Sequence, residues 1–94
     1  MNMAVYLVAY KINTVGSSPE QVVEAIKKVG TGWMHYIPNT ILITSNETAD
    51  VIGKKIFKLI TTSDYVLVIR VTKQYYGWLP QRAWDWLNND VNYD

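Results

Sequence analysis

The first apolar stretch of the chain, residues 3–12, carries a charge only at Lys11. In an extended chain Leu7 falls on one face and Val8 on the other, and both faces are largely apolar. A strand that is apolar on both faces is typical of the centre of a sheet. The pattern therefore predicts a buried first strand over residues 3–12.

Two later segments repeat their apolar residues at helical spacing. In the first, Ser18 and Gln21 match a capping box, Pro19 suits the first helical position and Gly30 ends the pattern. Thr48 is the expected N-cap of the second. The predicted apolar stripes consist of Val22, Val23, Ile26 and Val29 in the first helix, and Ala49, Ile52, Ile56, Leu59 and Ile60 in the second.

Three further strands follow from the remaining apolar runs. Residues 33–37 and 40–44 predict a hairpin that turns at Pro38 and Asn39, and residues 65–71 predict a strand that is apolar except at Arg70. The order β-α-β-β-α-β is that of the ferredoxin-like split unit. We expect a single α+β domain over residues 1–94 with a core over residues 3–73, in which the first and fourth strands pair centrally.

An aromatic-rich segment, residues 75–90, predicts a C-terminal helical extension that starts near Pro80. Its tryptophans could stack on bases, as in single-strand binders, or pack the extension over the sheet or against a second subunit. Helices on one side of a sheet leave the other side apolar, so something must cover it. We therefore favour packing, with Trp78, Trp84 and Trp86 as the candidate dimer interface.

Composition narrows the function classes. The chain has a net charge of +1, 49% hydrophobic residues and no cysteine. This balance excludes a strongly basic nucleic-acid binder, a disulfide scaffold and a thiolate metal site, although a local basic patch stays open. No stretch predicts a membrane span or a targeting segment. We expect a cytoplasmic protein. We also expect no cofactor and no metal, because the acidic residues show no ligand spacing.

Two cations occupy strand positions. Lys11, at the carboxyl end of the first strand, is either a phosphate contact or a solvated strand end. Arg70 is the charge of the fourth strand and a second candidate binding residue.

His35 is the single histidine of the chain and lies on the predicted face of Trp33 and Ile37. It could act as a general base or contact nucleic acid, but no carboxylate near it in sequence would orient it. We take Trp33 and His35 as candidate binding residues. The candidate catalytic residues are Lys11, His35, Tyr10 and Ser17.

Four segments carry a resemblance that covers most of the chain: YLVAYKIN (6–13), WMHYIPNTILI (33–43), VLVIRVT (66–72) and GWLPQRAWDWL (77–87). They resemble motifs of short bacterial and phage proteins described as SinR-like. That group is similar in fold to the small CRISPR adaptation subunit and to related toxin ribonucleases. The resemblance implies a ferredoxin-like homodimer.

In those nucleases the resemblance implies a metal-dependent site built on an aspartate at the end of the first strand, contributed by each subunit. Lys11 occupies that position, and a protonated lysine offers no lone pair to Mg²⁺. We therefore expect a non-catalytic dimeric binding or scaffold module with a degenerate nuclease-like site, its partner a nucleic acid or a protein. The alternatives are a small nuclease, metal-dependent or not, and a phage or defence-related regulator that binds a protein.

Overall fold

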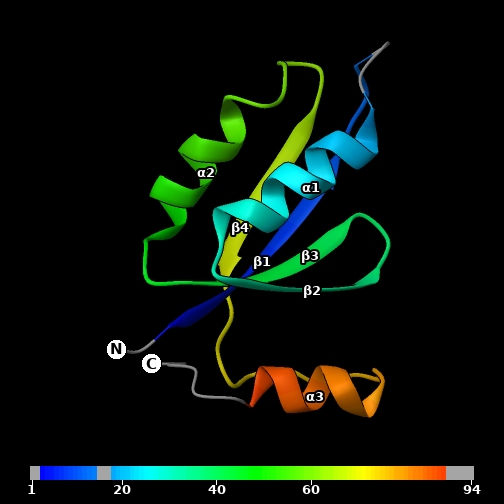
Figure 1. The fold of residues 1–94 in the computed structure, drawn as a ribbon, viewed down its shortest axis with the longest axis vertical. Helices are drawn as coiled ribbons and strands as arrows, with labels where there is room; N and C mark the ends of the chain where they lie inside the picture. Colours follow the sequence, from blue (N-terminus) through cyan, green and yellow to red (C-terminus); the bar gives the residue numbers. More distant parts are fainter. Residues whose placement is uncertain (1–2, 15–17, 89–94) are drawn as a thin grey trace.

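The computed structural model describes residues 3–14 and 18–88. Within them, four strands form one antiparallel sheet and three helices flank it, which confirms the α+β class and fits a ferredoxin-like fold (Figure 1). The elements are β1 (Ala4–Lys11), α1 (Pro19–Val29), β2 (Gly32–Ile37), β3 (Thr40–Ser45), α2 (Ala49–Phe57), β4 (Tyr65–Arg70) and α3 (Gln81–Leu87).

The strand order is β2-β3-β1-β4, so β1 and β3 occupy the centre. The pairing of the first and fourth strands is confirmed, but the prediction that the fourth strand is central is wrong. β4 lies at the edge of the sheet, and Leu67 and Ile69 on its outer face are 57% and 48% exposed. The apolar content of this strand reflects an uncovered face rather than burial on both sides.

Helices α1 and α2 cover one face of the sheet (Figure 1). Ile26 of α1 and Ile56 of α2 are fully buried against this face, as are Val8 of β1 and Ile41 of β3. These contacts confirm the predicted stripes in part. α2 ends at Phe57, so Leu59 lies outside the helix and is 44% exposed.

Helix α3 packs on the opposite face of the sheet, and only at one end of it. Ala83 and Leu87 of α3 are buried against Val5 of β1 and Met34 of β2. In Figure 1 α3 lies apart from α1 and α2, at the far end of the long axis. Of the helices within the described ranges, none has the length and apolar character needed to cross a bilayer.

Glycine is required where α1 leads into β2. A Cβ on Gly30 would stand 2.6 Å from the Thr44 carbonyl oxygen and 2.9 Å from the Ile43 Cβ. The following residue, Thr31, donates its backbone N–H to the Thr44 carbonyl at 2.8 Å. Because these backbones approach closely, the end of α1 packs directly against β3.

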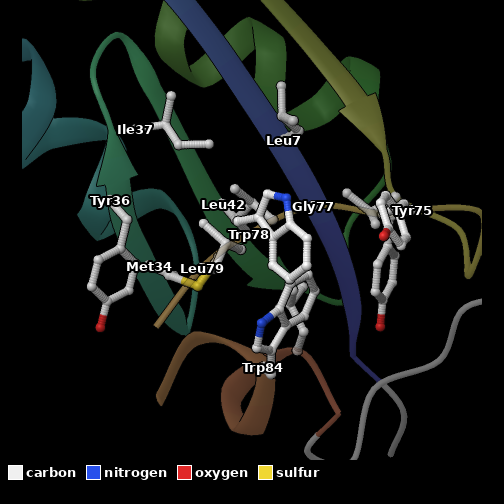
Figure 2. Close-up of a pocket in the computed structure, with 13 residues that line it drawn as sticks. Leu7, Met34, Tyr36, Ile37, Leu42, Tyr75, Gly77, Trp78, Leu79 and Trp84 are labelled. Carbon is white, nitrogen blue, oxygen red and sulfur yellow. The ribbon is translucent and has the colours of Figure 1, made fainter. Parts of the chain in front are cut away.

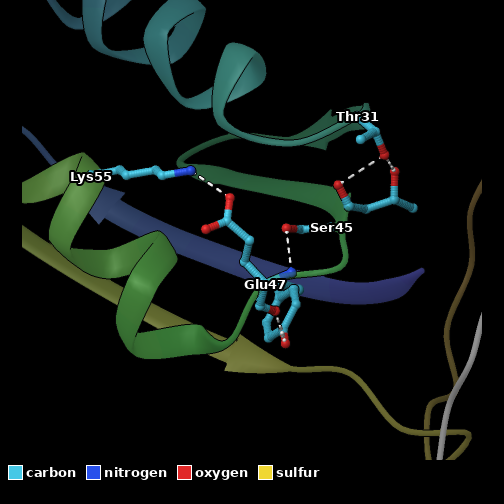
Figure 3. A network of polar contacts seen from close by, with 6 residues as sticks. Thr31, Ser45, Glu47 and Lys55 are labelled. Atoms are coloured by element: carbon cyan, nitrogen blue, oxygen red, sulfur yellow. Dashed lines mark hydrogen bonds and ion pairs between the residues drawn. The ribbon is translucent and has the colours of Figure 1, made fainter. Parts of the chain in front are cut away.

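A polar network joins the β3–α2 connection to the sheet and to the last turn of α2 (Figure 3). The Tyr6 hydroxyl donates to the Glu47 carbonyl at 2.6 Å, and the Glu47 N–H donates to the Ser45 Oγ at 3.0 Å. The Glu47 carboxylate pairs with Lys55 of α2. These contacts give the polar atoms of the β3–α2 connection hydrogen-bond and ion-pair partners within the chain.

Two local predictions are wrong. The Ser18 hydroxyl donates to the Glu20 carboxylate at 2.8 Å and makes no side-chain cap, so the expected capping box is absent. The β2–β3 register shifts between Met34 and Ile37, which places Ile37 opposite Thr40. Ile37 therefore shares the face of Met34 rather than that of Trp33.

Candidate functional site

Lys11 ends β1 as an exposed residue opposite Tyr65 of β4. With Tyr10, Asn39 and Thr40 it borders an open hollow at this end of the sheet. Burial raises the pKa of the Tyr10 phenol above its usual value of 10.0, so Tyr10 keeps its proton at neutral pH. The two candidates are adjacent on β1, but the Tyr10 side chain belongs to the cluster under α1 and α2 whereas Lys11 is exposed.

Asp64, next to Tyr65, already has hydrogen-bond partners for both of its carboxylate oxygens. Its Oδ1 accepts from the backbone N–H groups of Asn13 at 2.7 Å and Thr14 at 2.9 Å, and from the Thr14 hydroxyl at 2.9 Å. Its Oδ2 accepts from the Thr61 N–H at 3.0 Å. The Thr61 hydrogen bond, followed by those from Asn13 and Thr14, lowers the pKa of Asp64 to about 2. Asp64 thus ties two loops together beside Lys11.

Metal ligands do not gather anywhere within residues 3–14 and 18–88, where no group of three or more His, Cys, Asp or Glu side chains could hold an ion. At the end of β1 the side chain present is an ammonium, and the neighbouring carboxylate is bound to backbone donors. This donor set does not suit Mg²⁺, which binds through carboxylates and water.

His35 and Trp33 lie together on β2, away from Lys11. Both line a cavity of about 320 Å³ between β2 and α3, together with Tyr36, Arg82 and Trp86. This cavity, the β2–α3 cavity, shares no lining residue with the hollow at Lys11. The structure therefore separates the sequence-predicted candidates into two groups. Arg70 ends β4 and lines neither, and Ser17 lies outside the described residues.

A second cavity, of about 200 Å³, opens on the sheet face that α3 covers in part (Figure 2). Figure 2 shows the Trp78 side chain in the middle of this group, between Leu7 of β1 and Trp84 of α3. The walls are almost wholly apolar: Leu7, Met34, Tyr36, Ile37, Leu42, Val71, Tyr75, Tyr76, Gly77, Trp78, Leu79, Trp84 and Leu87.

The three tryptophans proposed as an interface occupy different environments. Trp84 stacks on Tyr75 with ring centroids 6.0 Å apart, and Trp84 and Trp86 both pack against the cluster under α3. Trp78 is 88% exposed and meets Tyr76, itself 90% exposed, edge to face at 6.2 Å. Trp78 is therefore the one of the three with most of its ring available to a partner.

Exposed apolar side chains continue from this cavity to the β4 edge. Ile69 lies opposite Leu7, and Leu67 lies opposite Ala9. The exposed apolar residues of β4, which we call the β4 row, therefore lie beside the β1 residues next to the cavity. We call this surface the open face. Its exposed members are Tyr36, Ile37, Tyr65, Leu67, Ile69, Tyr76 and Trp78.

In comparisons with known proteins, the chain matched no family model, no curated protein and no solved structure. The resemblance to the SinR-like proteins therefore stays a prediction.

Sequence reasoning did not place Arg82 and Tyr36 beside the same cavity as His35. Arg82 lies about fifty residues further along the chain, so only the position of α3 brings it to β2. Arg82 and Trp86 are four residues apart, which places both on one side of a helix. This spacing was the sequence signal that could have indicated a shared site.

Proposed function

We propose that the protein is a non-catalytic binding module that acts as a homodimer, with a second copy covering the open face. The observation that carries this proposal is the continuous apolar surface from Trp78 to the β4 edge. Soluble monomers rarely leave such a large apolar surface in water. Within the described chain, α3 covers only the end of this face that contains Val5 and Met34.

The size of the open face supports a second copy as its occupant. Tyr36, Tyr65, Tyr76 and Trp78, weighted by their exposed fractions, present roughly 600 Å² of residue surface. The aliphatic side chains of Ile37, Leu67 and Ile69 add to that area. A standard interface buries about 800 Å² on each partner, so the open face has the area that a stable dimer needs.

The shape of the β4 row also supports self-association. Tyr65, Leu67 and Ile69 alternate along one face of an edge strand. If the open faces of two copies pack against each other about a two-fold axis near Leu67, the row of Tyr65, Leu67 and Ile69 in each copy lies against the open face of the other. Such a two-fold interface uses the same patch on both subunits.

The surroundings of Lys11 support a non-catalytic role. An ammonium stands at the end of β1, and the carboxylate of Asp64 beside it accepts four hydrogen bonds from nearby loops. As parts of the same proposal, the fold is ferredoxin-like with an aromatic-rich tail, the chain is related to the SinR-like proteins, and the protein works in the cytoplasm.

Sedimentation equilibrium over a range of concentrations tests the proposal. We expect the wild-type protein to dimerise, and Leu67→Lys to shift it to monomer because the change places a charge in the interface. Phe57→Lys is the matched control, since Phe57 is exposed on α2 outside the open face. A wild-type protein that stays monomeric at every concentration would overturn the proposal, as would equal weakening by the two variants.

A further inference from the structure

The cavity of about 200 Å³ beside Trp78, which we call the open-face cavity, has walls without charge. Among the residues that the structure describes, no charged side chain lines it. The hydroxyl of Tyr75, one of its lining residues, donates to the Asn88 Oδ1 at 3.3 Å, and Asn88 is not part of the lining. A charged group inside this cavity would lose its hydration and find no ion-pair partner in the walls.

The walls of the open-face cavity are of two kinds. Leu7 of β1 and Leu42 of β3 contribute aliphatic side chains from the sheet. Trp78 and Trp84 contribute indole rings, and Figure 2 shows the Trp78 ring between Leu7 and Trp84. Trp84 is held in place by its stacking on Tyr75. Because aromatic rings pair in stacked or edge-to-face geometry, these walls favour an aromatic ligand over an aliphatic one of the same size.

The volume of the open-face cavity limits the size of its ligand. An apolar cavity of about 150 Å³ holds a benzene-sized molecule, so about 200 Å³ suits one substituted ring or two fused rings. The mouth of the cavity opens on the open face, because Tyr36, Ile37 and Trp78 line the cavity and are also exposed members of that face. A small ligand can therefore enter while α3 stays packed on the sheet.

We propose that the open-face cavity binds a small uncharged aromatic molecule of one or two rings. Trp78 and Trp84 make the ring contacts, and Leu7 and Leu42 make the aliphatic contacts. A ligand of this size should bind with a dissociation constant of about 0.1–1 mM. This inference goes beyond the proposed function and does not rest on it, because a monomer presents the same cavity.

Nuclear magnetic resonance of the indole N–H groups locates the bound ligand, since the chain has four tryptophans. The protein is the Leu67→Lys variant, in which the open face stays free and the cavity lining is intact, next to dilute wild type. With p-cresol as the probe, we expect saturable shifts of the Trp78 and Trp84 signals. The Trp33 signal is the internal reference, because Trp33 lies on the α1 side of the sheet under the Lys27 ammonium.

Two comparison ligands define the chemical class. Terephthalate replaces both substituents of p-cresol with carboxylates, so one charge must enter the cavity in either orientation. The saturated analogue 4-methylcyclohexanol keeps both substituents but lacks the aromatic ring. We expect both to bind at least roughly five-fold more weakly than p-cresol. Equal binding of terephthalate would overturn the uncharged class, and equal binding of 4-methylcyclohexanol would overturn the aromatic class.

A matched pair of tryptophan variants assigns the site. Trp78→Ala should weaken p-cresol binding roughly five-fold, because it removes one ring from the cavity, and Trp78→Phe should restore part of the loss. Trp33→Ala removes a ring that does not line the cavity and should leave binding unchanged. Equal losses in Trp78→Ala and Trp33→Ala would reject the open-face cavity as the site.

The failure of this inference and the failure of the homodimer give different results. A wild-type protein that sediments as a monomer but shows saturable shifts at Trp78 and Trp84 would overturn the homodimer and support the ligand site. A wild-type protein that dimerises, with no shifts in Leu67→Lys up to several millimolar p-cresol, would overturn the ligand site alone. Shifts that rise linearly without saturation, or that include Trp33 equally, would show non-specific contact and also overturn it.

Discussion

The two faces of the sheet use different kinds of apolar side chain. The face under α1 and α2 is closed mainly by aliphatic residues such as Ile26, Ile41 and Ile56, which have no exposed surface, and its two rings, Tyr6 and Tyr10, are buried as well. The open face is rich in Tyr and Trp, and its rings are mostly in contact with water. Branched aliphatic side chains fill a permanent core, whereas amphipathic rings are typical of surfaces that alternate between water and a partner. This difference distinguishes the face that holds the fold together from the face available for binding.

The largest expected effect comes from truncating the closed face. Ile41→Ala should lower the free energy of unfolding by about 3 kcal/mol, because it leaves a cavity between the sheet and the helices. Urea denaturation below the concentration for self-association measures this. Leu67→Ala on the open face is the comparison and should cost less than about 1 kcal/mol. Similar losses in the two variants would remove the distinction between the faces.

Gly30→Ala should come next in size. The added Cβ would meet the Thr44 carbonyl oxygen at 2.6 Å, so α1 must move away from β3, at a cost of about 1–3 kcal/mol. Thermal unfolding followed by circular dichroism is the measurement. Gly77→Ala is the control, because nothing lies within 4 Å of its added Cβ. Equal melting temperatures for Gly30→Ala and the wild type would contradict the close approach.

The next prediction concerns the pH dependence of folding stability, which we expect from Asp64 in the loop before β4. The pKa of Asp64 falls from an ordinary 3.8 to about 2 in the folded chain. The unfolded chain therefore takes up this proton first as the pH falls. The stabilisation is complete above the unfolded pKa and is lost as the pH falls through about 2.

Asp64→Asn should accordingly be less stable than the wild type at pH 6, and the gap should close between pH 4 and pH 2. Urea denaturation at several pH values measures the two profiles. Parallel profiles across this range would contradict the role of the carboxylate.

The smallest effect on folding should come from Trp78→Ala on the open face. Trp78 is mostly in water, so the free energy of unfolding of the monomer should change by less than about 0.5 kcal/mol. Self-association should weaken clearly, because a large exposed ring is lost from the open face. Calorimetric dilution measures the association. Large destabilisation of the monomer would instead place Trp78 in the core.

Local patterns predicted most of the fold, because alternation and helical spacing are properties of neighbouring residues. The positions of β1, α1 and the β2–β3 hairpin followed from them. The edge position of β4 did not, because an exposed apolar row and a buried one have the same sequence pattern.

The candidate sites were harder to predict than the elements. Trp33 and His35 are close in sequence and share a cavity, but Arg82 and Trp86 reach them only through the packing of α3. Three of the four hydrogen bonds to Asp64 also come from a loop distant in sequence, at Asn13 and Thr14. Contacts of this kind depend on tertiary structure, which periodicity does not encode.

The edge position of β4 also has a consequence for aggregation. The strand consists of six residues, five of them apolar or aromatic, and it lies where further strands could add. Short segments of this composition at a sheet edge favour the cross-β stacking of amyloid. Arg70 closes the segment with a charge, as gatekeeper residues do beside apolar strands. We therefore expect Arg70→Val to convert a self-limiting association into open-ended fibre growth.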